Sequence, residues 1–265
     1  MKKNVSKLPK LKPHLEQILI LIYRLRFLNT KQIQTLLNHK FASRIITWLN
    51  NLTKQKYLKR YYSTKFDREP AFYSLGTVGR KYFKVHNESV GIKEPLLDRV
   101  WQEHKNSLQF KRNSMLLGDI YISLINLTKT ASAKLGFYTK VDLFGMKYMI
   151  HPEPFCYFSI EDTNKAVKRY FLDIFDYFVP DDLYKRINKY MYYFEKRFWQ
   201  DNTDKPFPEI ILICPNKASK TFLEKTIAGR LKEKDLPMGF YLSSWEEITQ
   251  YGICRQVLHK VEVVN

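Results

Sequence analysis

Hydrophobic residues recur at helical spacing in three runs near the start of the chain. Proline suits the first turn of a helix, so a first helix is expected to begin at Pro13. Two shorter runs follow, on either side of a break at 38–40. The apolar residues of the three runs are Leu15, Ile18, Leu19, Ile22 and Leu25, then Ile33, Leu36 and Leu37, and finally Phe41, Ile45, Trp48, Leu49 and Leu52. This spacing predicts three amphipathic helices, of which the last two form a helix-turn-helix pair.

A β-hairpin is expected directly after these helices. Segments of β-type composition lie at 57–62 and 71–75, and a polar, basic tip at 63–70 joins them. Helix, turn, helix and then a hairpin with a basic tip is the order of a winged helix-turn-helix domain. The first part of the chain is therefore predicted to be such a domain.

Asparagine, glycine and proline gather after this domain, and such a composition favours a linker. We therefore divide the chain into a winged helix domain at 1–86, a linker at 87–95 and a second domain at 96–265. The first residues, 1–13, form a basic arm of the first domain. No internal repeat is visible.

The second domain should open with a long helix and continue with strands and helices in alternation. Its strands are expected at 137–144, 148–150, 155–160, 170–175, 208–214 and 240–242, and its helices at 96–129, 181–199, 218–232 and 245–249. A hairpin loop is expected at 161–168. The apolar run at 208–214 is unbroken, as is typical of a buried parallel strand. The expected fold class is α+β or α/β: a winged helix-turn-helix followed by an α/β domain with a mixed sheet.

Positive charge is concentrated in the first domain. The whole chain has 45 lysine and arginine residues against 26 acidic ones, a formal net charge of +19. Residues 1–86 hold 13 lysines and 6 arginines but 3 acidic residues, a net charge of +16. The other 179 residues hold 26 basic and 23 acidic residues, a net charge of +3. A general bias towards lysine would not stop near residue 86, so the asymmetry predicts that the first domain binds a polyanion.

Polar and basic side chains lie opposite the apolar face of the second helix of the helix-turn-helix pair. Side chains of these types reach the phosphates and base edges of double-stranded DNA. We expect Arg44, Thr47 and Asn51 to face the major groove, and the basic residues of the hairpin to contact phosphates. The predicted DNA-binding residues are Lys40, Ser43, Arg44, Thr47, Asn51, Lys54, Lys59, Lys65 and Arg68.

The cysteines and the hydropathy of the chain argue against several other classes of protein. Cys156, Cys214 and Cys254 are far apart and odd in number, which predicts buried free thiols and neither a disulfide framework nor a zinc site. The apolar run at 18–23 is short and stops at Arg24, so neither a secretory signal nor a membrane span is expected. The protein is therefore predicted to be cytoplasmic.

Several short motifs occur in a characteristic order along most of the chain. Residues 18–33 read Ile-Leu-x-Leu-Ile-Tyr-Arg-x-Arg-Phe-Leu-Asn-Thr-Lys-Gln-Ile, and residues 73–80 read Tyr-Ser-Leu-Gly-x-x-Gly-Arg. The other residues of the pattern are Ser43-Arg44, Leu49, Leu52, Tyr57-Leu58, and His104 with Asn113 on the long helix. In this order the chain resembles the replication-relaxation family of plasmid-encoded proteins. The resemblance implies a role in plasmid or mobile-element replication, DNA relaxation or its regulation, with a second copy or replication and mobilisation proteins as partners.

The second domain of that family is similar to the PD-(D/E)xK nuclease core. In that core two carboxylates and a lysine gather at a hairpin, where they bind Mg²⁺ or Mn²⁺ and activate water. The matching carboxylates here, and the candidate metal ligands, are Glu153, which follows Pro152, and Asp173. The position of the lysine is taken by Phe175, which cannot stabilise charge on a phosphate.

A replacement cation could come from Lys185 or Arg186, and Glu103 could add a carboxylate. Glu153, Asp173 and Lys185 are therefore the candidate catalytic residues. A plainer interpretation pairs Asp173 with Arg186. We expect a degenerate nuclease-like domain without a cofactor. The alternatives are a metal-dependent DNA nuclease or nickase, and a domain that dimerises or recruits replication proteins.

Overall fold

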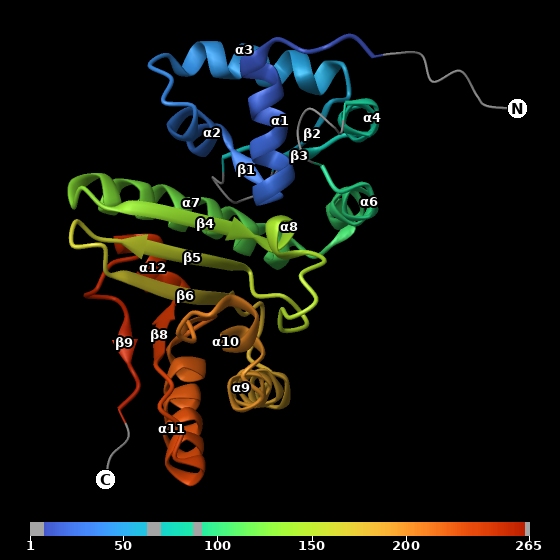
Figure 1. Cartoon of the computed structure of the whole chain (residues 1–265). Helices are drawn as coiled ribbons and strands as arrows, with labels where there is room; N and C mark the ends of the chain where they lie inside the picture. The colour runs from blue at the N-terminus through green and yellow to red at the C-terminus, as the bar shows by residue number, and fades with distance from the viewer. Residues whose placement is uncertain (1–7, 63–69, 87–91, 263–265) are drawn as a thin grey trace, which may run out of the picture. The chain divides into compact units, whose positions relative to one another are not determined.

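The computed structural model describes residues 8–62, 70–86 and 92–262 of the 265-residue chain. Its helices and its mixed sheet make the protein a member of the α+β class (Figure 1). The chain forms two compact units, which divide between Gly118 and Asp119. Within the described ranges, no helix has both the length and the apolar character needed to cross a membrane.

The first unit extends beyond the linker that the sequence predicts at 87–95. Helix α6 (Glu94–Gln102) packs against α4 (Thr77–Val85), and Arg80 Nε lies 2.6 Å from Asp98 Oδ1 across this contact. Helix α7 (Leu108–Thr130) contributes its first turns to the first unit and the remainder to the second. Residues 87–91 lie outside the described residues, so a linker at this place stays a prediction.

Three helices and a small sheet form the N-terminal part of the first unit. The elements before α4 are α1 (Pro13–Leu25), β1 (Leu28–Asn29), α2 (Thr30–Leu36), α3 (Ala42–Lys54), β2 (Leu58–Tyr61) and β3 (Phe72–Leu75). The strands are antiparallel and lie in the order β1-β3-β2. The three helices that the apolar spacing predicts, and the paired strands that the β-type composition predicts, are therefore present in this unit.

Local sequence explains where α2 begins and how α3 packs. Asn29 Oδ1 accepts a hydrogen bond from Gln32 N, and Gln32 Oε1 accepts one from Asn29 N, both at 2.9 Å. This reciprocal cap satisfies two amides at the start of α2. On α3, Ile45, Leu49 and Leu52 are buried on one face. The opposite face of α3, which is rich in polar and basic residues, is left to solvent.

The second unit is built on a six-stranded mixed sheet. Its strands are β4 (Lys134–Thr139), β5 (Cys156–Glu161), β6 (Val167–Ile174), β7 (Glu209–Cys214), β8 (Phe240–Ser244) and β9 (His259–Lys260), in that order across the sheet. Strands β4, β5 and β6 are antiparallel neighbours, β6, β7 and β8 run parallel, and β9 is antiparallel to β8. The mixed sheet that the sequence predicts is therefore confirmed.

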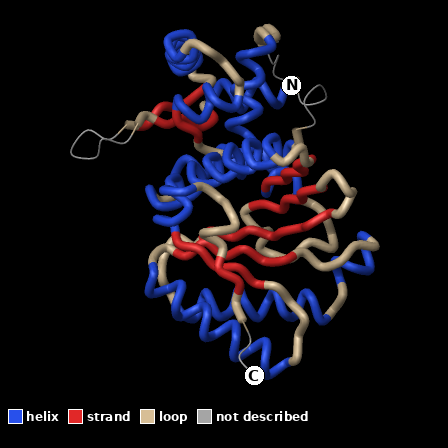
Figure 2. The backbone as a smooth tube through the Cα atoms, turned by 90° about the vertical axis from the view of Figure 1, so that its left-hand side faces the viewer, coloured by secondary structure: helices blue, strands red, loops and turns tan. Residues whose placement is uncertain are grey.

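Helices cover both faces of this sheet (Figure 2). The remaining helices are α8 (Lys140–Leu143), α9 (Pro180–Glu195), α10 (Phe198–Thr203), α11 (Lys217–Lys234) and α12 (Trp245–Tyr251). Helices α9 and α11 share a hydrophobic core with Phe171, Leu212 and Phe240 on one face. The second half of α7 lies over the other face. Because both faces are covered, β7 is buried from Ile210 to Cys214, as its unbroken apolar run predicts.

Two expected helices differ from the structure in their bounds. The helix expected at 96–129 is divided into α6, a 3₁₀ turn η1 (Glu103–Lys105) and α7, because the backbone of Asn106 is extended. His104 and Asn113 are consequently not on one helix. The helix expected at 181–199 ends at Glu195, because Arg197 adopts a left-handed conformation with φ of 53°.

One expected strand is shorter than predicted, and another was wrong. The strand expected at 137–144 stops at Thr139, where Asp142 Oδ2 accepts hydrogen bonds from Thr139 N at 2.8 Å and Oγ1 at 3.0 Å. This cap begins α8 in place of further strand. Residues 148–150 do not pair with another strand in the described part of the chain.

Candidate nucleic-acid interface and carboxylate cluster

Polar and basic side chains lie on the exposed face of α3 and on the neighbouring strand β2. Of the predicted DNA-binding residues, Lys65 and Arg68 lie outside the described residues. All of the others are exposed: Lys40, Ser43, Arg44, Thr47, Asn51, Lys54 and Lys59. Within the described residues, no carboxylate forms an ion pair with the basic members of this set. We call this set of exposed residues the α3 face.

The sequence around the α3 face explains its charge. Between Glu16 and Asp67 the chain has no acidic residue. The sequence prediction left out Lys56 and Arg60, which are also exposed beside this face. They line a hollow of about 490 Å³ together with Lys59. Their nearness to the hairpin was the signal that could have identified them.

Apolar and aromatic side chains accompany the basic ones at the start of α3. Phe41 is 54% exposed and Ile46 46% exposed, although both are large and hydrophobic. The Trp48 ring lies 5.0 Å from the His39 ring and 4.2 Å from the His14 ring, measured between centroids. These contacts fix the segment before α3 on the body of the unit. The sequence prediction treated Phe41 as part of the apolar face, whereas the structure places it at the surface.

Two glycines bring the start of α4 against the junction of α3 and β2. A Cβ atom on Gly76 would lie 2.3 Å from Lys56 O, and one on Gly79 would lie 2.4 Å from Tyr57 O. Any larger residue would therefore push the backbone apart. In addition, Gly76 N donates a hydrogen bond to Tyr57 O at 2.8 Å. The spacing of these glycines thus serves to hold the hairpin in place.

In the second unit, Asp173 is buried near the end of β6 and both of its carboxylate oxygens have donors. Arg186 Nε donates to Oδ2 at 2.6 Å, and the Tyr190 hydroxyl donates to the same atom at 2.9 Å. Phe155 N donates to Oδ1 at 3.2 Å. The interpretation that pairs Asp173 with Arg186 is therefore confirmed.

Arg186 is itself buried and fully engaged. Its Nη1 donates to Pro152 O at 2.7 Å, and its Nη2 donates to the Tyr190 hydroxyl at 3.1 Å. Burial lowers the pKa of Arg186, but the attraction of the Asp173 carboxylate outweighs it and raises this pKa above its ordinary value. Burial likewise raises the pKa of Tyr190, which keeps its hydroxyl protonated as a donor. The cluster is thus a closed ion pair with its hydrogen bonds made.

The other candidate catalytic residues do not complete a metal site. Glu153 is buried, and its Oε1 lies 3.5 Å from Nδ1 of the exposed His151. Lys185 is exposed and its ammonium lies 3.9 Å from Asp182. Glu103 belongs to the first unit, where it lies 2.9 Å from Arg26 Nε. In the parts of the chain that the structure describes, no three His, Cys, Asp or Glu side chains gather as metal ligands.

A divalent cation does not fit the arrangement around Asp173. The guanidinium of Arg186 already occupies the charged side of this carboxylate, and Phe175 packs against the hydrophobic core of the sheet. A cation would have to displace Arg186, which would leave a second positive charge buried without its partner. In this arrangement the Asp173–Arg186 pair stabilises the packing of α9 on the sheet.

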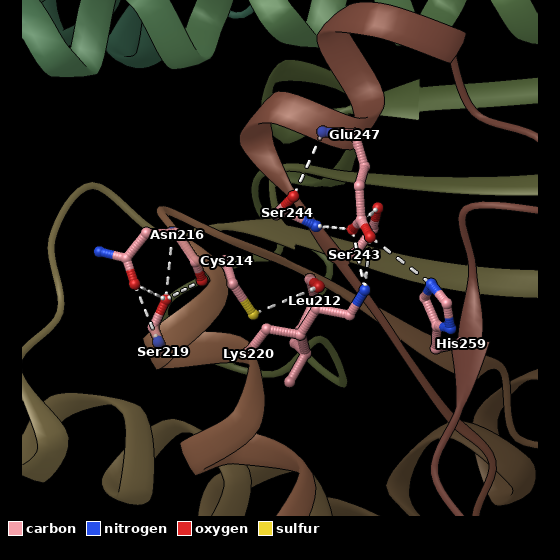
Figure 3. A network of polar contacts seen from close by, with 9 residues as sticks. All are labelled: Leu212, Cys214, Asn216, Ser219, Lys220, Ser243, Ser244, Glu247 and His259. Atoms are coloured by element: carbon pink, nitrogen blue, oxygen red, sulfur yellow. Dashed lines mark hydrogen bonds and ion pairs between the residues drawn. The ribbon is translucent and has the colours of Figure 1, made fainter.

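A second polar network joins the carboxyl ends of β7 and β8, and sequence reasoning did not find it (Figure 3). Lys220 Nζ lies 2.8 and 2.9 Å from the two carboxylate oxygens of Glu247, and His259 Nε2 lies 3.6 Å from Oε1. Ser244 N donates to Glu247 Oε2 at 2.7 Å. Burial raises the pKa of Glu247, but the bonds from Lys220 and Ser244 outweigh it and lower this pKa to about 2.

This network ties helix α11 to helix α12. Asn216 and Ser244 cap the two helices directly after the strands, and this was the signal in the sequence. Cys214 is buried beside the network, and burial raises its pKa to about 12, so its thiol is unreactive. The network therefore stabilises the packing of α11 and α12 at the carboxyl ends of β7 and β8.

Two comparisons with known proteins found no relative of this chain. No model of a protein family matches the chain, and no curated protein matches its sequence.

Proposed function

We propose that the protein binds double-stranded DNA through a winged helix-turn-helix in its first unit. The elements α1, β1, α2, α3, β2 and β3 follow one another in the order of that domain, and this supports the assignment. The observation that carries the proposal is the α3 face. It combines exposed basic and amide side chains with a stretch of chain that has no acidic residue from Glu16 to Asp67.

In this proposal α3 is the helix that enters the major groove. Guanidinium and amide groups form paired hydrogen bonds with guanine and adenine edges, so Arg44 and Asn51 read bases. Exposed apolar groups such as Phe41 and Ile46 suit contact with thymine methyl groups. Lys54 and Lys59 bind phosphates, which releases counterions and supplies affinity that does not depend on sequence.

We further propose that this binding serves the replication or relaxation of a plasmid or other mobile element, or its regulation, in the cytoplasm. The support is the motif order carried by residues 18–33 and 73–80, which resembles the replication-relaxation family. A second copy of the chain, or replication and mobilisation proteins, would be its protein partners.

The second unit, in this proposal, is a nuclease-like scaffold that does not cut DNA. The pairing of Asp173 with Arg186 and the phenyl ring at Phe175 support this assignment. A metal-dependent nuclease is the second candidate. It is favoured by one observation: Glu153 is buried and lies two residues before Phe155, whose amide donates to Asp173. That candidate requires Arg186 to leave Asp173.

The salt dependence of duplex binding tests the proposal. Affinity for a random-sequence duplex should fall with salt, and each lost phosphate contact should lower the slope of log K against log salt by about 0.9. Lys54→Ala and Lys59→Ala should each show this loss. Lys225→Ala, which removes an exposed lysine from α11, is the matched control and should leave the slope unchanged. Equal slopes in all three variants and the wild type would contradict the proposal.

A further inference from the structure

Helix α9 has an exposed face that the hydrophobic core of the second unit does not use. Side chains on this face are separated by four, three and four residues, so they lie on one side of the helix. They are Lys185, Lys189, Tyr192 and Lys196, and all of them are exposed. The neighbouring Tyr190 and Tyr193 are buried in the core, whereas Tyr192 is 54% exposed. Core packing therefore explains two of these three tyrosines and leaves Tyr192 unexplained.

A hollow of about 300 Å³ adjoins this face, between α9, the start of α10 and the segment 147–151. Its exposed lining residues are Lys147, His151, Lys189, Tyr192 and Phe198. Among the described residues, no aspartate or glutamate lines it. The acidic Glu195 on the same helix lies 2.7 Å from Lys234, which neutralises it. We call this hollow and its rim the α9 groove.

Two aromatic rings stand in the α9 groove. Phe198 is 44% exposed, and its ring centroid lies 6.5 Å from that of Tyr192. Lys196 Nζ lies 5.6 Å from the Tyr192 centroid. Aromatic faces flanked by lysines combine a stacking surface for bases with positive charge for phosphates.

We propose that the α9 groove binds single-stranded DNA. Bases within a duplex are stacked on one another, so their faces are closed to a ring on a protein surface, whereas unpaired bases can stack on such a ring. Tyr192 and Phe198 stack bases, and Lys147, Lys189 and Lys196 follow the phosphates. The assignment rests on the proposed function, because it takes DNA as the nucleic acid on which the protein acts. It adds an unpaired strand to the duplex that the α3 face would hold.

The test measures binding of the full chain to a fluorescent oligothymidylate of about 12 nucleotides by anisotropy. Loss of one stacked base costs about tenfold in affinity, so Tyr192→Ala should bind about tenfold more weakly. Tyr192→Phe keeps the ring and should bind as the wild type does. Tyr177→Ala is the matched control, because Tyr177 is also highly exposed, at 60%, and does not line the α9 groove. Lys189→Ala should lower the salt slope by about 0.7, the value for one phosphate of a single strand.

Two outcomes would overturn the assignment: no binding of oligothymidylate by the wild type, or equal affinities of Tyr192→Ala and Tyr177→Ala. Duplex binding by the same variants separates this result from the proposed function. Tyr192→Ala should keep its affinity for duplex. Lys54→Ala should lose duplex affinity, and combining it with Tyr192→Ala should still weaken oligothymidylate binding about tenfold. If the wild type binds duplex but Tyr192→Ala does not weaken oligothymidylate binding, only the assignment of the α9 groove is wrong. If Tyr192→Ala weakens oligothymidylate binding but the wild type does not bind duplex, only the proposed function is wrong.

Discussion

Replacing Arg186 with leucine removes the cation that neutralises Asp173 inside the second unit. Asp173 is 6% exposed and Arg186 8% exposed, so solvent cannot replace the lost partner. The substitution also removes the donors to Pro152 O and to the Tyr190 hydroxyl. Breaking a buried ion pair by deleting one partner costs about 3–5 kcal/mol, because the remaining charge stays buried. We expect Arg186→Leu to lower the free energy of unfolding by this amount.

Thermal and urea unfolding followed by circular dichroism would measure the effect. For a unit of this size, a loss of 3–5 kcal/mol corresponds to a fall of about 6–20 °C in the midpoint. The control is the double variant Asp173→Asn, Arg186→Leu. Its amide oxygen can still accept from Phe155 N, its NH₂ group can donate to the Tyr190 hydroxyl, and no charge remains buried, so it should recover most of the lost stability. If Arg186→Leu is as stable as the wild type, or the double variant recovers nothing, the closed ion pair is refuted.

Three further predictions follow from the two units. In the folded protein the pKa of Glu247 is about 2, compared with an ordinary value of 4.5. The ionised carboxylate and its bond to Lys220 therefore contribute their whole stabilisation above about pH 4.5, and this stabilisation is lost as the pH falls through about 2. The difference in thermal midpoint between the wild type and Glu247→Gln should therefore be constant from about pH 7 to 5 and shrink below that, and a constant difference down to pH 2 would be contrary to this. The wild type and Asp173→Ala should be equally inactive on supercoiled plasmid with Mg²⁺ or Mn²⁺, and nicking that disappears in the variant would restore the nuclease. A fragment that ends at Phe83 lacks α6 and α7 and should unfold more readily than one that ends at Thr130, whereas equal stability would support the division at 87–95.

The sequence predicts those features of the fold that depend on local pattern. The spacing of Ile45, Leu49 and Leu52 is enough to predict which face of α3 is buried, because helical period and burial are linked. The unbroken apolar run of β7 predicts a central strand, because such a strand is covered on both faces. The exposed positions of the α3 face that lie on the helix itself follow from the same periodicity.

Other features depend on contacts between distant residues, and local pattern does not contain them. The end of α9 is set by one left-handed residue, Arg197, whose side chain gives no helix-ending signal. The sequence offered both Lys185 and Arg186 as partners for Asp173, and only the packing of α9 on the sheet decides for Arg186. Burial of Tyr190 and Tyr193 but not of Tyr192 is likewise decided by that packing.

A charge reversal on α3 tests the central claim, that this helix binds duplex DNA, most directly. Arg44→Glu and Lys225→Glu change the net charge of the protein equally, and both residues are exposed, one on the α3 face and the other on α11. Their affinities for the same random-sequence duplex at one salt concentration therefore differ through position alone. We predict that Arg44→Glu lowers the affinity by about tenfold or more, because a cation near phosphates and bases becomes a repelled anion, while Lys225→Glu has little effect. Equal losses in the two variants, or no loss in Arg44→Glu, would contradict the account.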